Sequence, residues 1–388
     1  MSFPFPALRR RPDFEAPGLE ASDAADRLVL DESAAARESA GDGEVSVIGD
    51  AYGALTLAAA FDGRRGIRVH QDALTGERAL AANARERGLE NSFTSEADVP
   101  AAVTGAKLVL LRLPRSLDAL RDVAGMIAAH ADPDVIVFAG GRIKHMTVAM
   151  NDVLREFFTT VDVTHARQKS RVLIARGPHD GTDPAPRVER HPGLPTVCAF
   201  GGAFAGTSID IGTRLLLEHL PETLPSRADP DAPHSLVDLA CGTGVVAAWL
   251  ALHHPLHRVY ACDQSAVAVS SAAATAEVNG VADRITVVQD DGLALLPDAS
   301  SHFIALNPPF HIGAVVHDGV ALRLFADAAR VLAPRGELWT VWNSALNHRP
   351  TLERLVGPTR QVARTPKFTV TVSTRRERPD TASVAPAA

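Results

Sequence analysis

The stretch Val-Asp-Leu-Ala-Cys-Gly-Thr-Gly, residues 237–244, decides the fold of this chain. An apolar run leads into it, and the segment that follows carries apolar residues at helical spacing. Gly242 and Gly244 let the backbone turn tightly and approach a ligand without a Cβ atom in the way. The stretch therefore predicts a strand, a glycine turn and a helix whose first N–H groups face a ligand.

Strand-like runs alternate with helical segments along both halves of the 388 residues, which is typical of a βαβ sheet. Strands are expected at residues 44–49, 108–113 and 134–140, with a hairpin within 161–175, and again at 236–240, 258–263, 285–289, 303–307, 336–342 and 368–372. A segment dense in Pro, Gly and Asp separates the two halves. We therefore predict an α/β protein with two tandem, doubly wound, Rossmann-like domains: a first domain at 1–176, a linker at 177–194 and a second domain at 195–388.

Composition and charge limit the class of protein. Hydrophobic residues make up 46% and charged residues 22%, and no run approaches the roughly 18 apolar residues of a membrane span. The three cysteines lack metal-type spacing, so we expect a cytoplasmic protein without a metal or a membrane segment. The net charge of −7 argues against a general nucleic-acid coat protein, although basic residues gather at 142–144, 167–171 and 349–378. Each basic cluster is either a solvated face or a nucleic-acid contact.

Carboxylates stand at three successive strand ends of the second half. Asp238 lies where it would repel a phosphate but can hold an ammonium group, such as the one on the methionine part of S-adenosylmethionine. Asp263 ends the next strand, where a carboxylate can accept both hydroxyls of a ribose. Asp291 follows the third strand and could accept from an adenine amino group, with Asp290 as the adjacent alternative. An NAD site and a plain βα turn are the other interpretations, and the acid in the first turn counts against NAD.

The fourth strand of the second half runs into Asn307-Pro308-Pro309-Phe310, followed by His311. The prolines fix φ and remove two backbone donors, so the segment is a stiff strap whose acceptors are the Asn307 side chain and the Pro308 carbonyl. Two acceptors can hold the N–H groups of a planar exocyclic amine and aim its lone pair at a methyl group. Phe310 would stack on a flat substrate, and His311 would touch the substrate or cap the turn. The alternative is a Pro-Pro turn with Phe310 in the core.

These residues resemble a known family, the ribosomal-RNA guanine-N2 methyltransferases of the RlmG/RsmC type, and most closely its large-subunit type. The resemblance rests on the strap with His311, the glycine turn and the segments 208–213 and 336–343, and shorter N-terminal motifs extend it over residues 44–373. It implies tandem class I methyltransferase domains, S-adenosylmethionine as cofactor, and a flipped guanine of ribosomal RNA as substrate. We expect a monomer whose partner is ribosomal RNA or a ribosomal subunit.

The resemblance also implies roles for particular residues. The residues expected to carry catalysis are Asn307, Pro308, Pro309 and Phe310, and those expected to contact the substrate are Phe310 and His311. The residues expected to form the cofactor pocket are Asp238, Ala240, Gly242, Gly244, Asp263, Asp290, Asp291 and Asn307. Asp210 and Gly212 match a segment packed beside this pocket, and Ala240 stands where a first glycine is usual.

The first half is expected to be degenerate and non-catalytic. Its corresponding segment, residues 49–53, lacks paired close glycines, and Tyr52 would fill space that a cofactor needs. No Asn-Pro-Pro-aromatic strap occurs before residue 300. The resemblance assigns this half to RNA recognition or structural support. Two other functions remain open: methyl transfer to adenine N6 or to a protein glutamine amide, and an RNA-binding scaffold whose two sites are both inactive.

Overall fold

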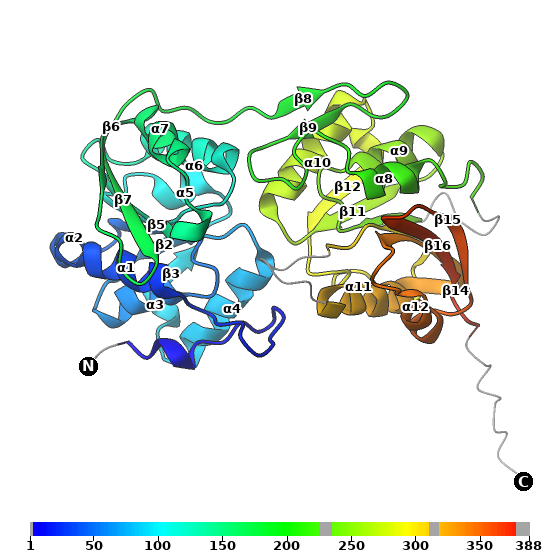
Figure 1. Cartoon of the computed structure of the whole chain (residues 1–388), viewed down its shortest axis with the longest axis horizontal. Coiled ribbons are helices and arrows are strands. Elements are labelled where there is room, and N and C mark those ends of the chain that lie inside the picture. The colour runs from blue at the N-terminus through cyan, green and yellow to red at the C-terminus, as the bar shows by residue number, and fades with distance from the viewer. Residues whose placement is uncertain (1–2, 225–234, 310–317, 378–388) are drawn as a thin grey trace, which may run out of the picture. The chain divides into compact units, whose positions relative to one another are not determined.

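The computed structural model describes residues 3–224, 235–309 and 318–377 (Figure 1). Tertiary contacts divide the chain into two compact units. The first unit comprises Met1–Arg187, Ala199–Gly206 and Gln264–Ser271, and the second comprises Val188–Cys198, Thr207–Asp263 and Ala272–Ala388. Two short segments from the second half of the sequence thus belong to the first unit. A division of the sequence into consecutive domains cannot describe this arrangement.

The first unit is built on a seven-stranded sheet with the strand order β3-β2-β1-β4-β5-β7-β6. Its strands are β1 (Val45–Ile48), β2 (Ile67–His70), β3 (Phe93–Ser95), β4 (Leu108–Arg112), β5 (Ile136–Arg142), β6 (Phe158–Val163) and β7 (Ser170–Pro178). Neighbours from β3 to β5 are parallel, whereas β7 runs antiparallel to both β5 and β6. Its helices are α1 (Ala24–Glu32), α2 (Ala34–Ser39), α3 (Ala54–Phe61), α4 (Leu74–Arg85), α5 (Val99–Val103), α6 (Leu117–His130) and α7 (Ala149–Arg155).

The second unit repeats this topology, with the strand order β12-β11-β10-β13-β14-β16-β15. Its strands are β10 (Leu236–Leu239), β11 (Val259–Asp263), β12 (Ile285–Gln289), β13 (Ser301–Leu306), β14 (Leu332–Asn343), β15 (Thr359–Arg364) and β16 (Phe368–Thr374). The remaining elements are the two-stranded sheet of β8 (Arg187–Glu189) and β9 (Val197–Ala199) and the helices α8 (Ile211–Leu217), α9 (Val245–His253), α10 (Ala266–Val278), α11 (Asp318–Val331) and α12 (Arg349–Leu355). The prediction of two tandem, doubly wound α/β folds is confirmed.

The two sheets can be equated residue by residue. The last residue of each central strand pairs with both neighbouring strands: Ile48 with His70 and Leu111, and Leu239 with Cys262 and Leu306. Counting onward from these pairs, Arg112 corresponds to Asn307 and Gln71 corresponds to Asp263. Both central strands are buried along their whole length, as parallel strands covered by helices on two faces should be. Sites in such sheets form at the carboxyl ends of the strands, where the strand order reverses.

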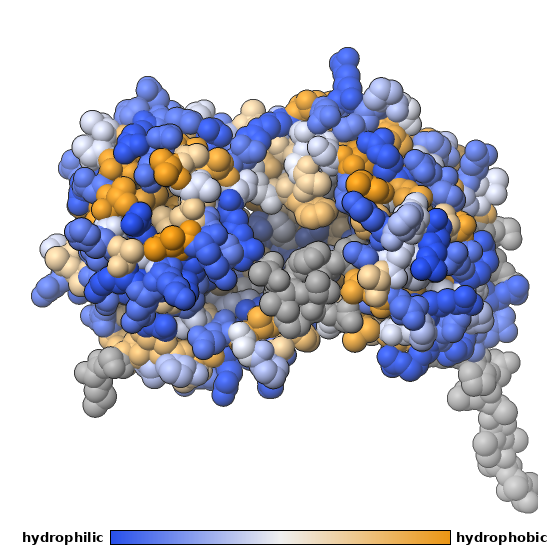
Figure 2. Space-filling model, in the orientation of Figure 1, coloured by the Kyte–Doolittle hydropathy of each residue, from blue (hydrophilic) through white to orange (hydrophobic). Residues whose placement is uncertain are grey.

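The visible surface is mostly hydrophilic. Figure 2 shows apolar side chains in small groups among polar ones. Within the described parts of the chain, no helix combines the length and the apolar character needed to cross a membrane.

Candidate active site

The glycine turn of the second unit joins β10 to α9. Ala240, Gly242 and Gly244 have φ values of 58°, 54° and 74°. A left-handed conformation costs a residue with a Cβ atom about 1–2 kcal/mol, so Ala240 carries strain that a glycine would avoid. A Cβ atom on Gly244 would lie 2.7 Å from the Cβ of Ala272, whereas one on Gly242 would meet no atom within 4 Å. Packing against α10 therefore requires Gly244, and Gly242 borders open space in which a ligand can lie.

Asp238 lies beneath this turn, in β10. Its side chain is buried, and Oδ2 accepts a hydrogen bond of 2.8 Å from the backbone N–H of Ala247 in the first turn of α9. Burial raises the pKa of Asp238 to about 8, and the neighbouring Asp263 acts in the same direction. A positively charged group of a ligand would stabilise the ionised carboxylate, because it would offset this burial.

Asp263 ends β11 and braces the same turn. Its Oδ2 accepts a hydrogen bond of 3.0 Å from the N–H of Gly242. The structure thus brings together the acid of the second strand and the glycine turn after the first strand. The sequence predicts both residues in one pocket but does not reveal the hydrogen bond between them.

The two adjacent acids after β12 have different surroundings. Asp290 is buried, and its two oxygens accept from the N–H groups of Asp291 and Leu295, so its carboxylate closes its own turn. Asp291 instead forms an ion pair with Arg323 of α11, at 2.7 Å. The sequence does not indicate that Arg323 belongs to this site, because nothing in its local pattern links it to the end of a distant strand.

Asn307 directly follows β13, and its side-chain amide is fixed from one side. Its Nδ2 donates to Oδ2 of Asp210 at 3.2 Å and to Oγ1 of Thr213 at 2.9 Å. An ionised carboxylate can only accept, so Asp210 dictates that Nδ2, and not Oδ1, faces α8. The Asn307 Oδ1 atom is buried and has no partner among the described residues. The arrangement leaves one amide oxygen aimed away from α8 and available to a ligand N–H.

The start of α8 holds the side chain of Asp210 in place. Asp210 is the N-cap residue of that helix, and its Oδ2 also accepts from the N–H groups of Gly212 and Thr213. The sequence resemblance had placed Asp210 and Gly212 beside the pocket, and the contact of Thr213 with Asn307 is new. No local pattern indicates this contact, because the two residues are 94 positions apart in the sequence.

The rest of the strap is described only in part. Pro308 is buried and Pro309 is exposed, so the chain leaves the sheet at this point. Phe310 and His311 lie outside the described residues.

Two buried cysteines belong to the glycine turn and to β11. Burial raises the pKa of both Cys241 and Cys262 well above the ordinary value of a thiol, which keeps them protonated. No group of His, Cys, Asp and Glu side chains that could hold a metal ion occurs within the described ranges.

The corresponding turn of the first unit is closed by its own side chains. The buried Asp50 accepts from the N–H groups of Leu55 and Thr56, the first donors of α3. The hydroxyl of Tyr52 donates to Asp13 at 2.5 Å, and the guanidinium of Arg10 lies 4.5 Å from the centre of the Tyr52 ring. The groups that would meet the charged end of a cofactor are therefore already engaged.

Together, these features define a class of protein. Class I methyltransferases have a doubly wound sheet with a late antiparallel strand, here β16 between β14 and β15, and a glycine turn after the first strand. In this chain the described part of an Asn-Pro-Pro strap follows the fourth strand of the second unit. Residues 195–372 match the family model "Methyltransferase small domain", and residues 2–179 match "RLMG N-terminal domain".

The chain belongs to the family of ribosomal RNA large subunit methyltransferase G. It is 33% identical to the member from Pseudomonas putida and 32% identical to that from Streptomyces coelicolor, and each alignment covers 94% of this chain and 96% of the relative. Its fold is similar to that of the T. thermophilus 16S rRNA N2 G1207 methyltransferase RsmC, solved in complex with AdoMet and guanosine. The TM-score is 0.72 at 21% identity, covering 94% of this chain and 97% of that one. The family inferred from the sequence motifs is confirmed.

Proposed function

We propose that the second unit transfers a methyl group from S-adenosylmethionine to the exocyclic N2 amine of a guanine in ribosomal RNA. Membership of the family supports this reaction, and the RsmC structure shows that this fold can hold AdoMet and guanosine together. The observation that carries the proposal is the Asn307 amide. Its oxygen is buried without a partner among the described residues, and Asp210 and Thr213 fix its orientation.

The cofactor fits the residues around the glycine turn. We assign Asp238 to the ammonium end of the cofactor, because its buried carboxylate needs a positive partner. The open space beside Gly242 would let the cofactor contact the backbone of the turn. Ala240 and Gly244 shape the turn, and Asp263 would accept from the ribose. Asp291 is the better candidate for the adenine end, because both oxygens of Asp290 serve its own turn. The bound cofactor supplies a methyl group on a positively charged sulfur, which requires no metal to activate it.

The strap would prepare the accepting nitrogen. The lone pair of an aromatic amine is delocalised into its ring, so the nitrogen is a poor nucleophile. The Asn307 Oδ1 and the Pro308 carbonyl would each accept one N–H, which draws the nitrogen toward tetrahedral geometry and aims its lone pair. Such positioning can lower a barrier by about 7–11 kcal/mol in well-aligned cases. The fixed dipoles also stabilise the positive charge that develops on the nitrogen before it releases a proton to solvent.

The remaining assignments complete the proposal. Pro309 stiffens the strap, Phe310 stacks on the flipped guanine, and His311 contacts it. Asn307 also borders the cofactor, because its strand adjoins β10. We place the enzyme in the cytoplasm, acting as a monomer on ribosomal RNA.

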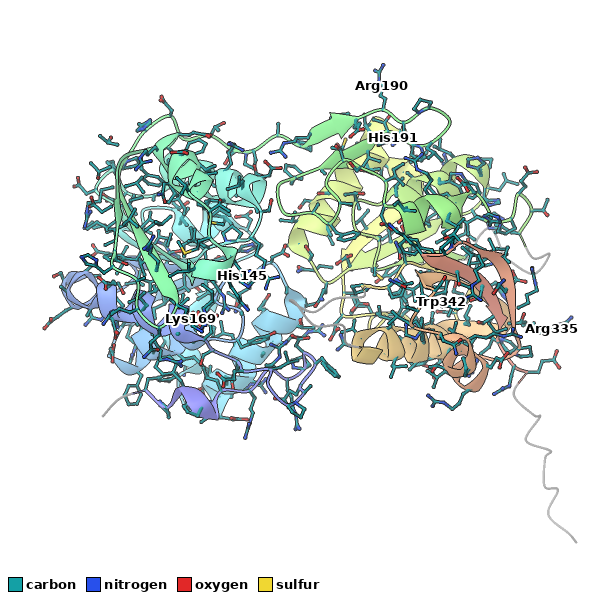
Figure 3. All side chains as sticks on the ribbon, in the orientation of Figure 1. His145, Lys169, Arg190, His191, Arg335 and Trp342 are labelled. Carbon is teal, nitrogen blue, oxygen red and sulfur yellow. The ribbon has the colours of Figure 1, made fainter. Side chains whose placement is uncertain are left out.

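Exposed basic side chains offer contacts to the RNA backbone. On the second unit, Arg360 and Arg364 lie on β15 at the edge of the sheet, and Arg190 and Arg335 extend outward in Figure 3. Lys169 is exposed in the hairpin between β6 and β7 of the first unit. Such contacts bind phosphates without reading the sequence. We therefore assign the first unit a non-catalytic role in RNA recognition or structural support.

The test is mass spectrometry of ribosomal RNA nucleosides from cells that lack this protein. One N2-methylguanosine should disappear and should return with the wild-type protein. It should also return with Asn343→Ala, a matched substitution of an exposed asparagine at the end of β14, but not with Asn307→Ala.

Other outcomes would redirect the assignment. Loss of a methylated adenine or of a methylated protein glutamine, with every N2-methylguanosine intact, would move the reaction to another acceptor. No loss of any methyl group would favour the RNA-binding scaffold.

A further inference from the structure

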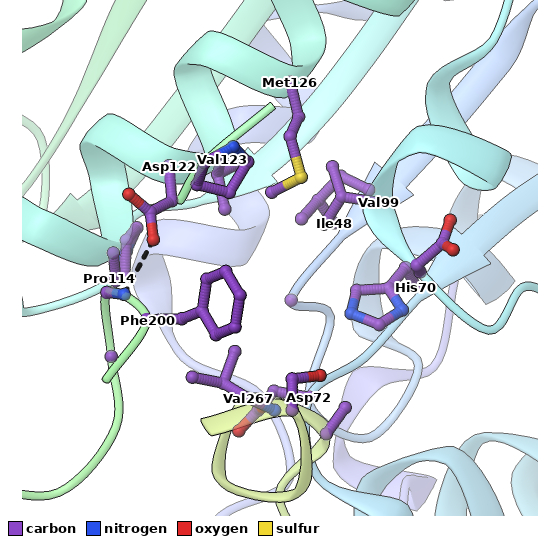
Figure 4. Close-up of a pocket in the computed structure, with 18 of the residues that line it drawn as sticks. Ile48, His70, Asp72, Val99, Pro114, Asp122, Val123, Met126, Phe200 and Val267 are labelled. Atoms are coloured by element: carbon purple, nitrogen blue, oxygen red, sulfur yellow. Dashed lines mark hydrogen bonds between the residues drawn. The ribbon is translucent and has the colours of Figure 1, made fainter. Parts of the chain in front are cut away.

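The first unit contains a cavity of about 680 Å³ that the proposed methyl transfer does not use (Figure 4). Every lining residue belongs to the first unit. The cavity lies at the carboxyl ends of the parallel strands: His70 ends β2, Arg112 ends β4, Gly49 follows β1, and Asp98 comes shortly after β3. The strand order reverses at this edge, which is where doubly wound sheets bind their ligands. Its volume is in the range of ordinary small-molecule sites.

The sheet register makes this cavity the counterpart of the cofactor pocket in the second unit. Gly49 corresponds to Ala240, and Arg112 corresponds to Asn307. The end that would receive the amino-acid part of a cofactor is closed, since Asp50 takes the first N–H groups of α3. What remains open is the part of the pocket that corresponds to the nucleoside.

The walls suit a flat aromatic ring. In Figure 4, Phe200 and His70 lie on opposite sides of the cavity, and Met126 and Val267 border the space between them from two other sides. The apolar lining residues include Ile48, Val99, Val123, Met126 and Val267. A base could stack on the Phe200 ring, and the thioether of Met126 adds a favourable contact with an aromatic edge.

Polar groups at the same edge could fix the orientation of such a ring. The His70 Nδ1 lies 3.1 Å from the carbonyl oxygen of Glu96, so in the neutral ring Nδ1 carries the proton and Nε2 is an acceptor. Gln71 follows His70 in the chain, at the position of Asp263 in the second unit. Its side chain is 8% exposed, and neither of its amide atoms has a partner among the described residues. Gln71 is not among the lining residues, so His70 is the residue of this pair that a ligand in the cavity would meet.

The charges around the cavity disfavour phosphate. Four carboxylates line it: Asp72, Asp98, Asp122 and Asp183. The two guanidinium groups are those of Arg112 and Arg115, and Arg112 is already paired with Asp23 and Asp26 of the first unit. A phosphate would therefore meet an excess of negative charge.

We propose that this cavity binds a purine nucleoside that carries no phosphate, with adenosine as the simplest form, at a site separate from the methyl-transfer site. The choice of adenine rests on the proposed cofactor pocket of the second unit, whose nucleoside end the cavity matches. The absence of a phosphate rests on the lining charges alone.

Calorimetric titration of the full chain with adenosine tests this proposal, in the presence of saturating S-adenosylhomocysteine to fill the methyl-transfer site. The wild type should still bind one equivalent of adenosine. Phe200→Ala should weaken this binding by about fivefold or more, because a stacked base typically gains 1–3 kcal/mol from its aromatic partner. Met126→Trp should abolish it by filling the cavity. Glu38→Trp, on an exposed position of α2 outside the cavity, should bind as the wild type does.

Ligand variants sharpen the result. AMP should bind more weakly than adenosine because of the carboxylates, and uridine should bind more weakly because its ring offers less surface for stacking. Absence of adenosine binding under these conditions would overturn the proposal, as would equal binding by Phe200→Ala and the wild type. Circular dichroism would show whether Met126→Trp is folded. If it is not, the adenosine affinity of Phe200→Ala still tests the proposal. A failure of S-adenosylhomocysteine to bind would contradict the proposed function and leave the cavity variants as an independent test.

Discussion

The glycine turns of the two units share a backbone and differ in what they leave open. Gly49, Ala51 and Gly53 of the first turn have positive φ values, as do Ala240, Gly242 and Gly244 of the second. In the first unit the acid lies inside the turn and takes the helix N–H groups for itself. In the second unit the acid lies beneath the turn, in the strand, and the space beside Gly242 stays open. The backbone therefore preserves the turn, and the side chains decide whether it can hold a ligand.

The strand ends that follow show the same contrast. Asn307 meets Asp210 and Thr213 at the start of α8, and Arg112 meets Asp23 and Asp26 at the start of α1. A neutral amide held by an acid keeps one oxygen available, whereas a guanidinium held by two acids forms a closed ion-pair group. The same architecture thus leaves a buried acceptor without a partner among the described residues at the strand end of one unit and forms an ion-pair group at that of the other.

Replacing the residue at the end of the fourth strand of each sheet should give the largest difference in turnover between the two units. We expect Asn307→Ala to lower turnover by about 100-fold or more, because removing one oriented polar group from a transition state costs this much in other enzymes. Cofactor affinity should stay within a few-fold. Steady-state assays with labelled cofactor, together with calorimetry, measure both quantities.

The matched variant in the first unit is Arg112→Ala. It should leave turnover almost unchanged and lower the free energy of unfolding by about 1–3 kcal/mol, because it leaves the buried Asp26 without its ionic partner. Equal losses of turnover in the two variants would remove the distinction between a reactive and a structural strand end.

The acid after the second strand should matter for the cofactor in only one unit. Asp263→Ala is expected to weaken S-adenosylmethionine binding by about tenfold or more, since it removes the ribose acceptor and the brace on Gly242. Gln71→Ala, at the corresponding place, should leave the dissociation constant unchanged. Calorimetric titration compares the two, and an unchanged value for Asp263→Ala would reassign the ribose contact.

A milder change tests how the Asn307 amide is oriented. Asn remains a good N-cap, so Asp210→Asn should preserve α8 but remove the carboxylate that dictates which amide atom faces the helix. We expect kcat to fall by about tenfold with KM within about twofold, a fraction of the loss caused by removing the acceptor itself.

Asp23→Asn at the matching cap of α1 should leave both constants alone. A rise in KM without a change in kcat for Asp210→Asn would indicate that Asp210 shapes the pocket and does not orient the amide.

The last comparison concerns the pH dependence of cofactor binding. Burial raises the pKa of Asp238 to about 8, so this carboxyl is largely protonated at neutral pH without a ligand. A cationic ligand favours the ionised form, and binding must then release a proton. Cofactor affinity should therefore rise with pH, by up to about tenfold per unit below the pKa, until the ligand ammonium begins to lose its own proton.

Matched variants again separate the units. Asp238→Asn should remove this pH dependence, whereas Asp50→Asn should retain it, although burial also raises the pKa of Asp50 to about 7. Titrations between pH 5.5 and 7.5 avoid deprotonating the ligand ammonium, whose pKa is near 8 in model compounds. A flat profile for the wild type would show that Asp238 does not meet a positive group.

The amino-acid sequence by itself determined the doubly wound folds, the glycine turn, the strap and the family. These features depend on local rules: apolar periodicity marks strands and helices, and glycine and proline restrict the backbone wherever they occur. The sequence predicts that Tyr52 obstructs the first turn, whereas in the structure Asp50 accepts the N–H groups at the start of α3.

Only the tertiary structure decided which hydrogen-bond and ion-pair partners each side chain has. The sequence offered Asp291 with Asp290 as the adjacent alternative, and in the fold Asp290 bonds to its own turn whereas Asp291 pairs with Arg323. The orientation of the Asn307 amide depends on Asp210, which is 97 residues away, and so no local pattern can contain it. The cavity of the first unit likewise forms from Gly49, Met126, Phe200 and other residues that only folding brings together. Hydrogen-bond partners and cavities are properties of distances in space, and a sequence fixes these only through the complete fold.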